Sequence, residues 1–442
     1  MSVSLDNDRG LLEAELQSPE PPWMIDTDGS RGPRALEQLS DSDVDPAELI
    51  DLVLKLANTA PHFSTETAAA QLHLPLQIID ELLWQLKDDK FVEILGENGP
   101  FSYRYAITAR GREEAARVMD FCGYIGPAPV ALDSYRSMLS LQIRDQPDVS
   151  SEAIRAALSD LVLPESAVQV TELAVSAGRS LFLFGPAGNG KTSVAKSIHQ
   201  AIDGEIWIPY AISVAGSVVQ IFDPQVHRPV EHVSRAGGKI DGRWVKVRRP
   251  LIVAGGEMTI DALDLAYSPS LRYYESPLHL KANGGTFVID DFGRQRIDPD
   301  ALLNRWIIPL EHQIDHLTLH TGQKFEVPFN LMLVVATNLS VDDVADPAFL
   351  RRMGYRVHLD MPTPAGYRLI FERYASKLGA QVGENVIARL LERYRNEDRE
   401  LRCCEPRDLI ERVRDICRLH SVPFELKPET LDLAWTGYFG NM

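Results

Sequence analysis

One short run of residues constrains the fold of this 442-residue chain more than any other feature. It fits the pattern G-x-x-x-x-G-K-[ST] in full and consists of Gly185, Pro186, Ala187, Gly188, Asn189, Gly190, Lys191 and Thr192. An apolar run precedes it at residues 180–184, and helical periodicity follows over residues 192–202. Glycines in such a loop let backbone N–H groups turn toward phosphate oxygens, and the helix start adds positive potential. The run therefore predicts a strand, a phosphate-binding loop and a helix, in that order.

The side chains of this loop have expected roles toward a bound nucleotide. Lys191 places a cation between the β- and γ-phosphates, and the Thr192 hydroxyl ligates Mg²⁺. Ser193, the next residue, belongs to the same expected nucleotide-binding set. The sequence therefore predicts ATP and Mg²⁺ as cofactors.

Two acids at the end of a second apolar run supply groups that hydrolysis needs. Residues 285–289 predict a buried strand, and Asp290 and Asp291 follow it directly. The first acid at such a strand end can hold the Mg²⁺ shell, and the second can orient or deprotonate the attacking water. We assign Asp290 to Mg²⁺ and Asp291 to the water.

Further candidate residues follow in order along the chain. A third apolar run, residues 331–336, leads to Asn338, which we expect between the γ-phosphate and the second acid. An arginine from a neighbouring subunit stabilises transition-state charge in many enzymes of this chemistry, and Arg352, with Arg351 beside it, is the candidate here. Arg407 lies near the start of a C-terminal helix, where it either reaches back to the nucleotide from a lid or forms a salt bridge.

Taken together, these motifs resemble those of AAA+ ATPases. GPAGNGKT, FVIDD, VVATN, DPAFLRR and EPRDL occur in the order Walker A, Walker B, sensor 1, arginine finger and sensor 2 across residues 150–442. The resemblance implies an α/β fold, namely a P-loop NTPase αβα core with a parallel five-stranded sheet at residues 150–362 and a helical lid at 363–442. It also implies a homo-oligomeric ring, usually a hexamer, with ATP at each interface.

One branch of that family is more similar than the rest, and one residue departs from its pattern. The region around the two acids resembles that of enhancer-binding activators, magnesium chelatases and MoxR-like ATPases. Residues 316–330 predict a β-hairpin just before sensor 1. A hairpin at this position resembles the one that is typical of the same branch. The second Walker B acid is usually Glu in the family, whereas Asp291 is shorter by one methylene. We therefore expect either slow turnover or ATP binding without efficient hydrolysis.

The first third of the chain differs in character, because most of the net charge of −18 lies there. Residues 1–45 are rich in Ser, Pro, Asp and Glu and predict a disordered acidic leader. Residues 46–124 predict three helices, two strands and a final helix, an order that resembles a winged helix-turn-helix. Residues 125–149 are expected to form a linker.

Composition excludes several other classes of protein. Hydrophobic residues make up 45% and charged residues 24% of the chain, as in ordinary globular proteins. The sequence has no apolar run long enough to span a membrane and no secretory signal at its start. The 4 cysteines include no C-x-x-C pair, which argues against a disulfide scaffold or a zinc ribbon. We expect a cytoplasmic protein.

The distribution of charge also bears on the partner. The acidic N-terminal unit disfavours DNA, because attraction to phosphates supplies most baseline affinity for it. A basic stretch at residues 235–249 predicts a hairpin that could contact nucleic acid or an acidic protein segment. The favoured function is a ring-forming, chaperone-like ATPase that remodels a protein client. The alternatives are a nucleic-acid-associated ATPase or regulator and a nucleotide-dependent scaffold with negligible turnover.

Overall fold

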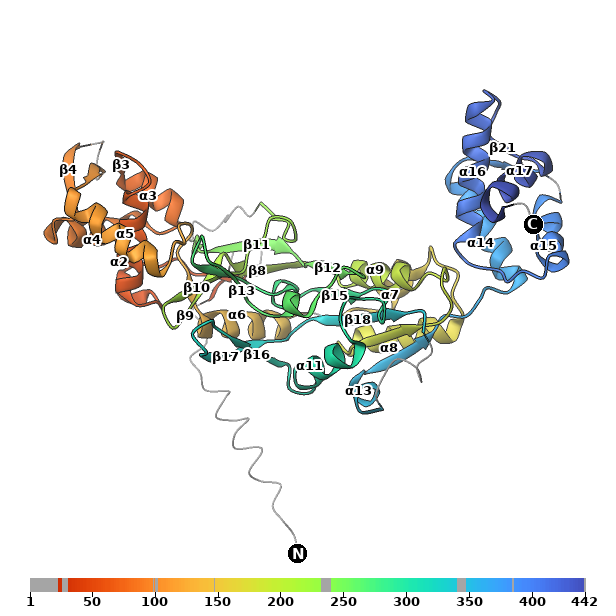
Figure 1. Cartoon of the computed structure of the whole chain (residues 1–442), viewed down its shortest axis with the longest axis horizontal. Helices are drawn as coiled ribbons and strands as arrows, with labels where there is room; N and C mark the ends of the chain where they lie inside the picture. Colours follow the sequence, from red (N-terminus) through yellow and green to blue (C-terminus); the bar gives the residue numbers. More distant parts are fainter. Residues whose placement is uncertain are drawn as a thin grey trace, which may run out of the picture.

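The computed structural model describes residues 23–25, 31–97, 99, 102–146, 148–231, 240–339, 347–383 and 385–440. An N-terminal unit of helices and a small sheet lies at one end of the long axis, and a C-terminal helical unit lies at the other (Figure 1). Larger sheets and their helices fill the space between these units. No helix in the described part of the chain is both long and apolar enough to cross a membrane.

The N-terminal unit contains the elements that were predicted for residues 46–124. Its helices are α2 (Pro46–Ala57), α3 (Thr65–Leu72), α4 (Leu76–Asp88) and α5 (Ala109–Phe121), and its strands are β3 (Phe63–Ser64), β4 (Val92–Glu97) and β5 (Tyr103–Ile107). The strands form an antiparallel sheet in the order β3-β5-β4. Side chains of Asp45, Ser64 and Thr108 accept backbone N–H groups at the starts of α2, α3 and α5. These caps satisfy donors that a helix start leaves open, so local sequence explains where the helices begin.

The prediction of a disordered leader is wrong for residues 31–45. β1 (Trp23–Ile25) pairs antiparallel with β2 (Arg31–Pro33), and the 3₁₀ helix η1 (Leu39–Asp41) follows. Leu39 and Val44 are buried, and the buried Arg243 forms an ion pair with Asp43. The burial of these few apolar residues offsets an ordering cost that the average composition of the segment conceals. The rest of the predicted leader, residues 1–22 and 26–30, lies outside the described residues.

The prediction of a linker at residues 125–149 is also wrong. These residues contain β6 (Val130–Ala131) and α6 (Leu132–Arg144), in which Tyr135, Met138 and Leu139 are buried at helical spacing. β6 joins a five-stranded sheet in the order β13-β14-β10-β9-β6. The other strands of this second sheet are β9 (Ala211–Val214), β10 (Ser217–Gln220), β13 (Ala266–Ser268) and β14 (Tyr273–Glu275).

Next to this second sheet lies a strand pair that contains part of the predicted basic hairpin. β8 (Glu205–Pro209) pairs antiparallel with β11 (Trp244–Arg248). Lys246 forms an ion pair with Glu205, and the Arg249 guanidinium donates to the Gly284 carbonyl oxygen. Residues 232–239 of the chain lie outside the described part. In the described part of residues 235–249, several basic side chains are therefore engaged by the protein itself.

An αβα sandwich with a parallel sheet in the order β12-β15-β18-β7-β19 forms the centre of the molecule. The strands are β7 (Leu181–Phe184), β12 (Leu251–Ala254), β15 (Thr286–Ile289), β18 (Met332–Thr337) and β19 (Tyr355–His358). Along β15, Phe287 and Ile289 pack in one core cluster while Val288 packs in another, so both faces of the sheet are buried. The predicted α/β fold class with a P-loop NTPase core is confirmed.

Helices cover both faces of this sheet. α7 (Ser151–Leu158), α8 (Glu165–Ser176) and α9 (Lys191–Ala201) contribute to one cluster, and η2 (Ile260–Leu263), α11 (Pro299–His312) and α13 (Pro347–Arg352) contribute to the other. The short α10 (Leu278–Lys281) precedes β15. β16 (Ile314–Thr318) and β17 (Lys324–Pro328) form the predicted antiparallel hairpin before β18. The carboxyl ends of β7, β15 and β18 meet at one edge of the sheet, where ligands of such folds bind.

The C-terminal helical unit has a core of its own. It consists of α14 (Pro364–Lys377), β20 (Gln381–Val382), α15 (Val386–Asn396), α16 (Glu405–Leu419), β21 (Glu425–Leu426) and α17 (Pro428–Phe439). The buried residues of its cluster run from Tyr367 to Trp435. The unit occupies the residues for which a helical lid was predicted, and its first helix is capped by the Thr363 side chain.

Candidate nucleotide-binding site

The phosphate-binding loop lies between β7 and α9, as its sequence predicts. Gly185 has a φ of +135°, and a Cβ there would lie 2.3 Å from the carbonyl oxygen of Leu359. Gly188 has a φ of +82°, and a Cβ there would lie 2.7 Å from the Cys404 Sγ. Both positions therefore require glycine for backbone conformation and for space. Gly190 is the N-cap of α9, so the start of that helix faces the loop.

Lys191, the first residue of α9, is buried against this loop. Its Nζ donates to the carbonyl oxygens of Gly185 and Pro186, both at 2.8 Å. Burial lowers the pKa of Lys191, and the carboxylates of Asp291 and Asp290 oppose that shift. The ammonium group is thus held by neutral acceptors, and negatively charged phosphate oxygens would accept stronger hydrogen bonds from it.

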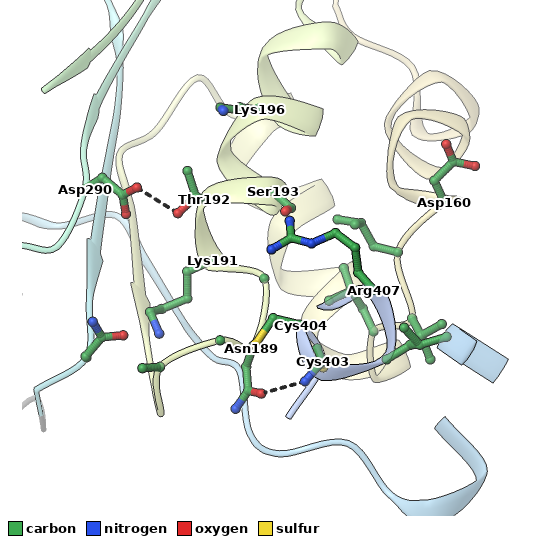
Figure 2. Close-up of a pocket in the computed structure, with 18 of the residues that line it drawn as sticks. Asp160, Asn189, Lys191, Thr192, Ser193, Lys196, Asp290, Cys403, Cys404 and Arg407 are labelled. Carbon is green, nitrogen blue, oxygen red and sulfur yellow. Dashed lines mark hydrogen bonds between the residues drawn. The ribbon is translucent and has the colours of Figure 1, made fainter. Parts of the chain in front are cut away.

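Thr192 and Asp290 form the pair expected at a Mg²⁺ site. Thr192 Oγ1 donates to Asp290 Oδ2 at 2.7 Å, which links the start of α9 to the end of β15 (Figure 2). A hydroxyl and a carboxylate are ligands of the type that Mg²⁺ prefers, and at nucleotide sites the ion uses only one or two protein groups besides phosphates and water. The two residues therefore fit the ion.

Asp291 and Asn338 meet from two different strand ends. Asn338 Nδ2 donates to Asp291 Oδ1 at 2.7 Å. Asp291 has a φ of +51°, a left-handed conformation that few residues other than glycine adopt. Gln295 fixes this turn, because its side chain accepts from the Gly293 N–H at 2.9 Å and donates to the Asp290 carbonyl at 2.8 Å. The turn thereby holds the exposed Asp291 carboxylate at the edge of the sheet.

A cavity of about 780 Å³ connects these groups. One end contains residues of the loop from Ala187 to Ser193, together with Asp290, Asp291 and Asn338. Apolar side chains line the other part of the cavity: Leu161, Val162, Leu163, Ile370 and Tyr374. A cavity with a charged end and an apolar end suits a nucleotide, whose phosphates and flat base need those two environments.

Residues just before α16 contact the loop from the C-terminal unit. The backbone N–H of Cys404 donates to the Gly188 carbonyl oxygen at 2.9 Å. The backbone N–H of Cys403 donates to Asn189 Oδ1 at 3.3 Å (Figure 2). Burial raises the pKa of Cys403 to about 11, so its thiol stays protonated at neutral pH. The C-terminal unit thus contributes to one wall of the cavity and contacts the loop through its backbone.

Arg407 forms the salt bridge that was one of its two expected roles, and it also lies at the cavity. It lines the cavity, and in Figure 2 its side chain extends toward Ser193 at the start of α9. Its guanidinium also forms an ion pair with Asp408, with Nη2 and Oδ1 3.0 Å apart. The side chain therefore lies at the cavity and is held by an acid, and its contact with a nucleotide stays a prediction.

Four of the predicted residues do not line this cavity, namely Gly185, Pro186, Arg351 and Arg352. The first two form the base of the loop and bind Lys191 through their carbonyl groups. The two arginines end α13, and Arg352 Nη2 lies 2.9 Å from Glu311 Oε2. A residue that acts on the nucleotide of a neighbouring subunit is not expected in its own cavity, so this placement is compatible with the predicted role.

Sequence reasoning missed several residues that line the cavity: Asp160, Lys196, Arg294, Lys377, Cys403 and Cys404. Lys196 lies four residues after Thr192 on α9, so helical spacing would have found it. Arg294 belongs to the turn after Asp291, so its closeness in sequence to the two acids was an available signal. The two cysteines had no such signal, because their position depends on how the C-terminal unit packs against the loop.

The family model described as "Domain of unknown function (DUF8689)" matches residues 363–437. No curated protein matches the chain. Among solved structures, the chain is similar to the RuvB Holliday junction branch migration motor of Thermotoga maritima, with 15% identity, a TM-score of 0.35, and 61% of this chain and 66% of that chain covered. It is also similar to NtrX from Brucella abortus in complex with ADP, with 14% identity, a TM-score of 0.40, and 73% and 59% covered. The chain therefore spans less than two thirds of the length of either.

Proposed function

We propose that this protein is an AAA+ ATPase that binds and hydrolyses ATP with Mg²⁺. The observation that carries the proposal is a pair of hydrogen bonds in one cavity, from Thr192 to Asp290 and from Asn338 to Asp291. They join side chains from three separate motifs at the carboxyl edge of a parallel sheet. A glycine-rich turn that only starts a helix has no need of polar side chains from two other strand ends.

Each of these groups has its own task. Lys191 and the loop N–H groups bind the β- and γ-phosphates. Mg²⁺, held by Thr192 and Asp290, neutralises charge on the phosphates when it is bound. Asp291 orients or deprotonates the attacking water, and Asn338 fixes the position of that carboxylate. Because Asp291 is shorter than the usual glutamate, we propose that turnover is slow.

We further propose that the protein works in the cytoplasm as a homo-oligomeric ring, a hexamer, which remodels a protein client. Support for assembly comes from Arg351 and Arg352, which lie outside the cavity of their own subunit, as arginine fingers do. The β16–β17 hairpin before β18 supports a place in the MoxR-like branch, which carries a hairpin just before sensor 1.

The N-terminal unit is, in this proposal, a winged helix-turn-helix that binds protein. Its α4 carries Asp80, Glu81 and Asp88 but few basic residues. Trp84 on the same helix is 39% exposed, and the Lys87 Nζ lies 3.7 Å from its ring centroid. An acidic helix repels DNA phosphates, whereas exposed aromatic and acidic side chains suit a basic, partly apolar protein segment.

A nucleic-acid-associated ATPase is the second candidate, and the described residues weaken its basis. Within the basic stretch, Arg243 is buried with Asp241, and Lys246 is paired with Glu205. Assays of ATP hydrolysis with duplex and single-stranded DNA separate the two candidates. Stimulation that falls steeply as salt rises would favour the nucleic-acid reading, because phosphate contacts release counterions.

Two variants test the ATPase proposal. Lys191→Ala removes the phosphate-binding cation and should abolish binding of a fluorescent ATP analogue. Asp291→Asn keeps that cation and should retain ATP while turnover falls by about 10² or more. Hydrolysis at the wild-type rate in both variants would refute the proposed enzyme. Pull-down with the ATP-trapped Asp291→Asn protein then tests for a bound client.

A further inference from the structure

One arginine in the cavity has no role in the function proposed above. Arg294 lines the cavity together with Asp290, Asp291 and Asn338. It belongs to the turn after β15, and its backbone N–H donates to the Asp291 carbonyl oxygen at 3.0 Å. The two side-chain hydrogen bonds of Gln295 fix the same turn. Arg294 is therefore held on the structure that presents both acids.

The position of this turn places Arg294 at the phosphate end of the cavity. The turn begins with Asp290, which is hydrogen-bonded to the Thr192 hydroxyl at the start of α9. The apolar part, with Leu161 and Tyr374, lies on other elements, before α8 and on α14. A cationic side chain that lines the cavity from this turn thus belongs to the same part of the site as the residues expected to bind the terminal phosphates.

Among the described residues, none forms a hydrogen bond or ion pair with the Arg294 guanidinium, and the side chain is exposed. Two other cations of the site differ in this respect, whereas the exposed Lys196 and Lys377 also have no such partner among the described residues. Lys191 is bonded to loop carbonyls, and Arg407 is paired with Asp408. Arg294 therefore keeps its full set of donors available for a ligand, and a guanidinium matches the spacing of phosphate oxygens.

We propose that Arg294 is a catalytic residue that stabilises charge on the γ-phosphate of the ATP bound by its own subunit. Charge spreads over the γ-phosphate oxygens in the transition state of phosphoryl transfer, and an arginine supplied from the same chain stabilises it in some NTPases. Arg294 acts in addition to Arg352, which the neighbouring subunit supplies. This inference rests on the proposed ATPase function.

Steady-state hydrolysis and ATP binding by the full chain test the role, with Arg296 as a matched control. Arg296 lies two residues further on, is exposed, and does not line the cavity. Arg294→Ala should lower kcat by about 10² or more while the Kd for ATP changes less than about threefold. Arg294→Lys should recover part of the rate, because it keeps the charge but loses the planar fork. Arg296→Ala should match the wild-type protein.

Retained ATP binding by Arg294→Ala also shows that the variant is folded. The inference is overturned if this variant turns over at the wild-type rate, or if its affinity for ATP falls in the same proportion as kcat. Hydrolysis by the wild-type protein with no loss in Arg294→Ala refutes this inference alone. Absence of hydrolysis in the wild-type protein refutes the proposed ATPase function and the inference together.

Mixed assemblies separate action on the same subunit from action on a neighbour. Arg294→Ala subunits are combined with Lys191→Ala subunits, which lack the phosphate-binding cation. If Arg294 acts on the nucleotide of its own subunit, every nucleotide site in the mixture lacks either Arg294 or Lys191. The hydrolysis rate then stays at that of the two variants assayed separately. Recovery well above that level means that Arg294 acts across an interface, which overturns the assignment.

Discussion

Asn338 determines where the proposed water-orienting carboxylate sits. Its Nδ2 lies 2.7 Å from Asp291 Oδ1 at the exposed edge of the sheet. The preceding Thr337 is buried, and its hydroxyl donates to the Phe292 carbonyl oxygen at 2.8 Å. Thr337, the last residue of β18, and Asn338, which follows it, thus hold the turn after β15, one through a buried contact and one through an exposed contact. The exposed contact can be removed while the buried one maintains the turn.

Asn338→Ala should therefore lower ATP turnover by about 10–10² with little change in ATP affinity, because a misplaced carboxylate aligns water poorly. The measurement is kcat together with the Kd for ATP. Thr337→Ala is the contrasting variant, since loss of its buried hydrogen bond should cost about 1 kcal/mol of stability. Equal losses of affinity and kcat in Asn338→Ala would show that Asn338 serves ground-state binding instead.

At the scale of elements, a buried ion-pair cluster anchors the β16–β17 hairpin to the core. Asp315 of β16 is 1% exposed, and its Oδ2 accepts from Arg305 of α11 and lies 2.8 Å from His279 Nε2 of α10. Burial acts to raise the pKa of Asp315, but the hydrogen bonds from His279 and Arg305 prevail and lower it to about 2. The hairpin is therefore tied to the helix that follows the two acids of the nucleotide site.

Asp315→Asn should destabilise the protein by about 2 kcal/mol at pH 7, because the pairing that lowers this pKa is lost. The folded-state pKa lies below the ordinary value of 3.8, so the wild-type advantage is complete above about pH 5. It then declines as the pH falls toward 2. Thermal melts of the wild-type protein and of Asp315→Asn at pH 7 and at pH 3 measure this difference in stability. Asp264→Asn, which removes an exposed partner of Arg305, should change little.

Individual elements show how far sequence reasoning extends. The β16–β17 hairpin was predictable because alternating strands flank a turn at Gly322, which has a φ of +86°. The acids and Asn338 were predictable because each directly follows an apolar strand. α6 was not predictable from its place in the chain, a segment between two recognised units, although its apolar residues have helical spacing. The contact of Cys404 with Gly188 could not be predicted, because no local pattern encodes packing between distant segments.

At the scale of the whole molecule, the N-terminal unit is joined to the second sheet and its neighbouring strands by polar contacts. Glu48 Oε2 accepts from the Ser213 hydroxyl at 2.6 Å, and His73 Nδ1 lies 2.7 Å from the Gly242 carbonyl oxygen. Most residues of the second sheet and its neighbouring strands lie in the chain between α9, which carries Thr192, and β15, which Asp290 directly follows. This segment between α9 and β15 therefore also contacts the unit that we propose to bind a partner.

A variant of Arg352 tests the proposed assembly, because the proposed action of this arginine on ATP requires a second subunit. Arg352→Ala should lower turnover by about 10³ while ATP binding is kept, since Arg352 does not line the cavity of its own subunit. Lys191→Ala should be inactive because it cannot bind ATP. In a mixed ring, a Lys191→Ala subunit supplies an intact Arg352 to a neighbouring site that binds ATP. The mixture should then hydrolyse ATP faster than the summed rates of the two variants assayed separately, as measured by steady-state turnover. If sedimentation detects mixed oligomers and the hydrolysis rate stays at the sum of the two separate variants, Arg352 does not act across the interface.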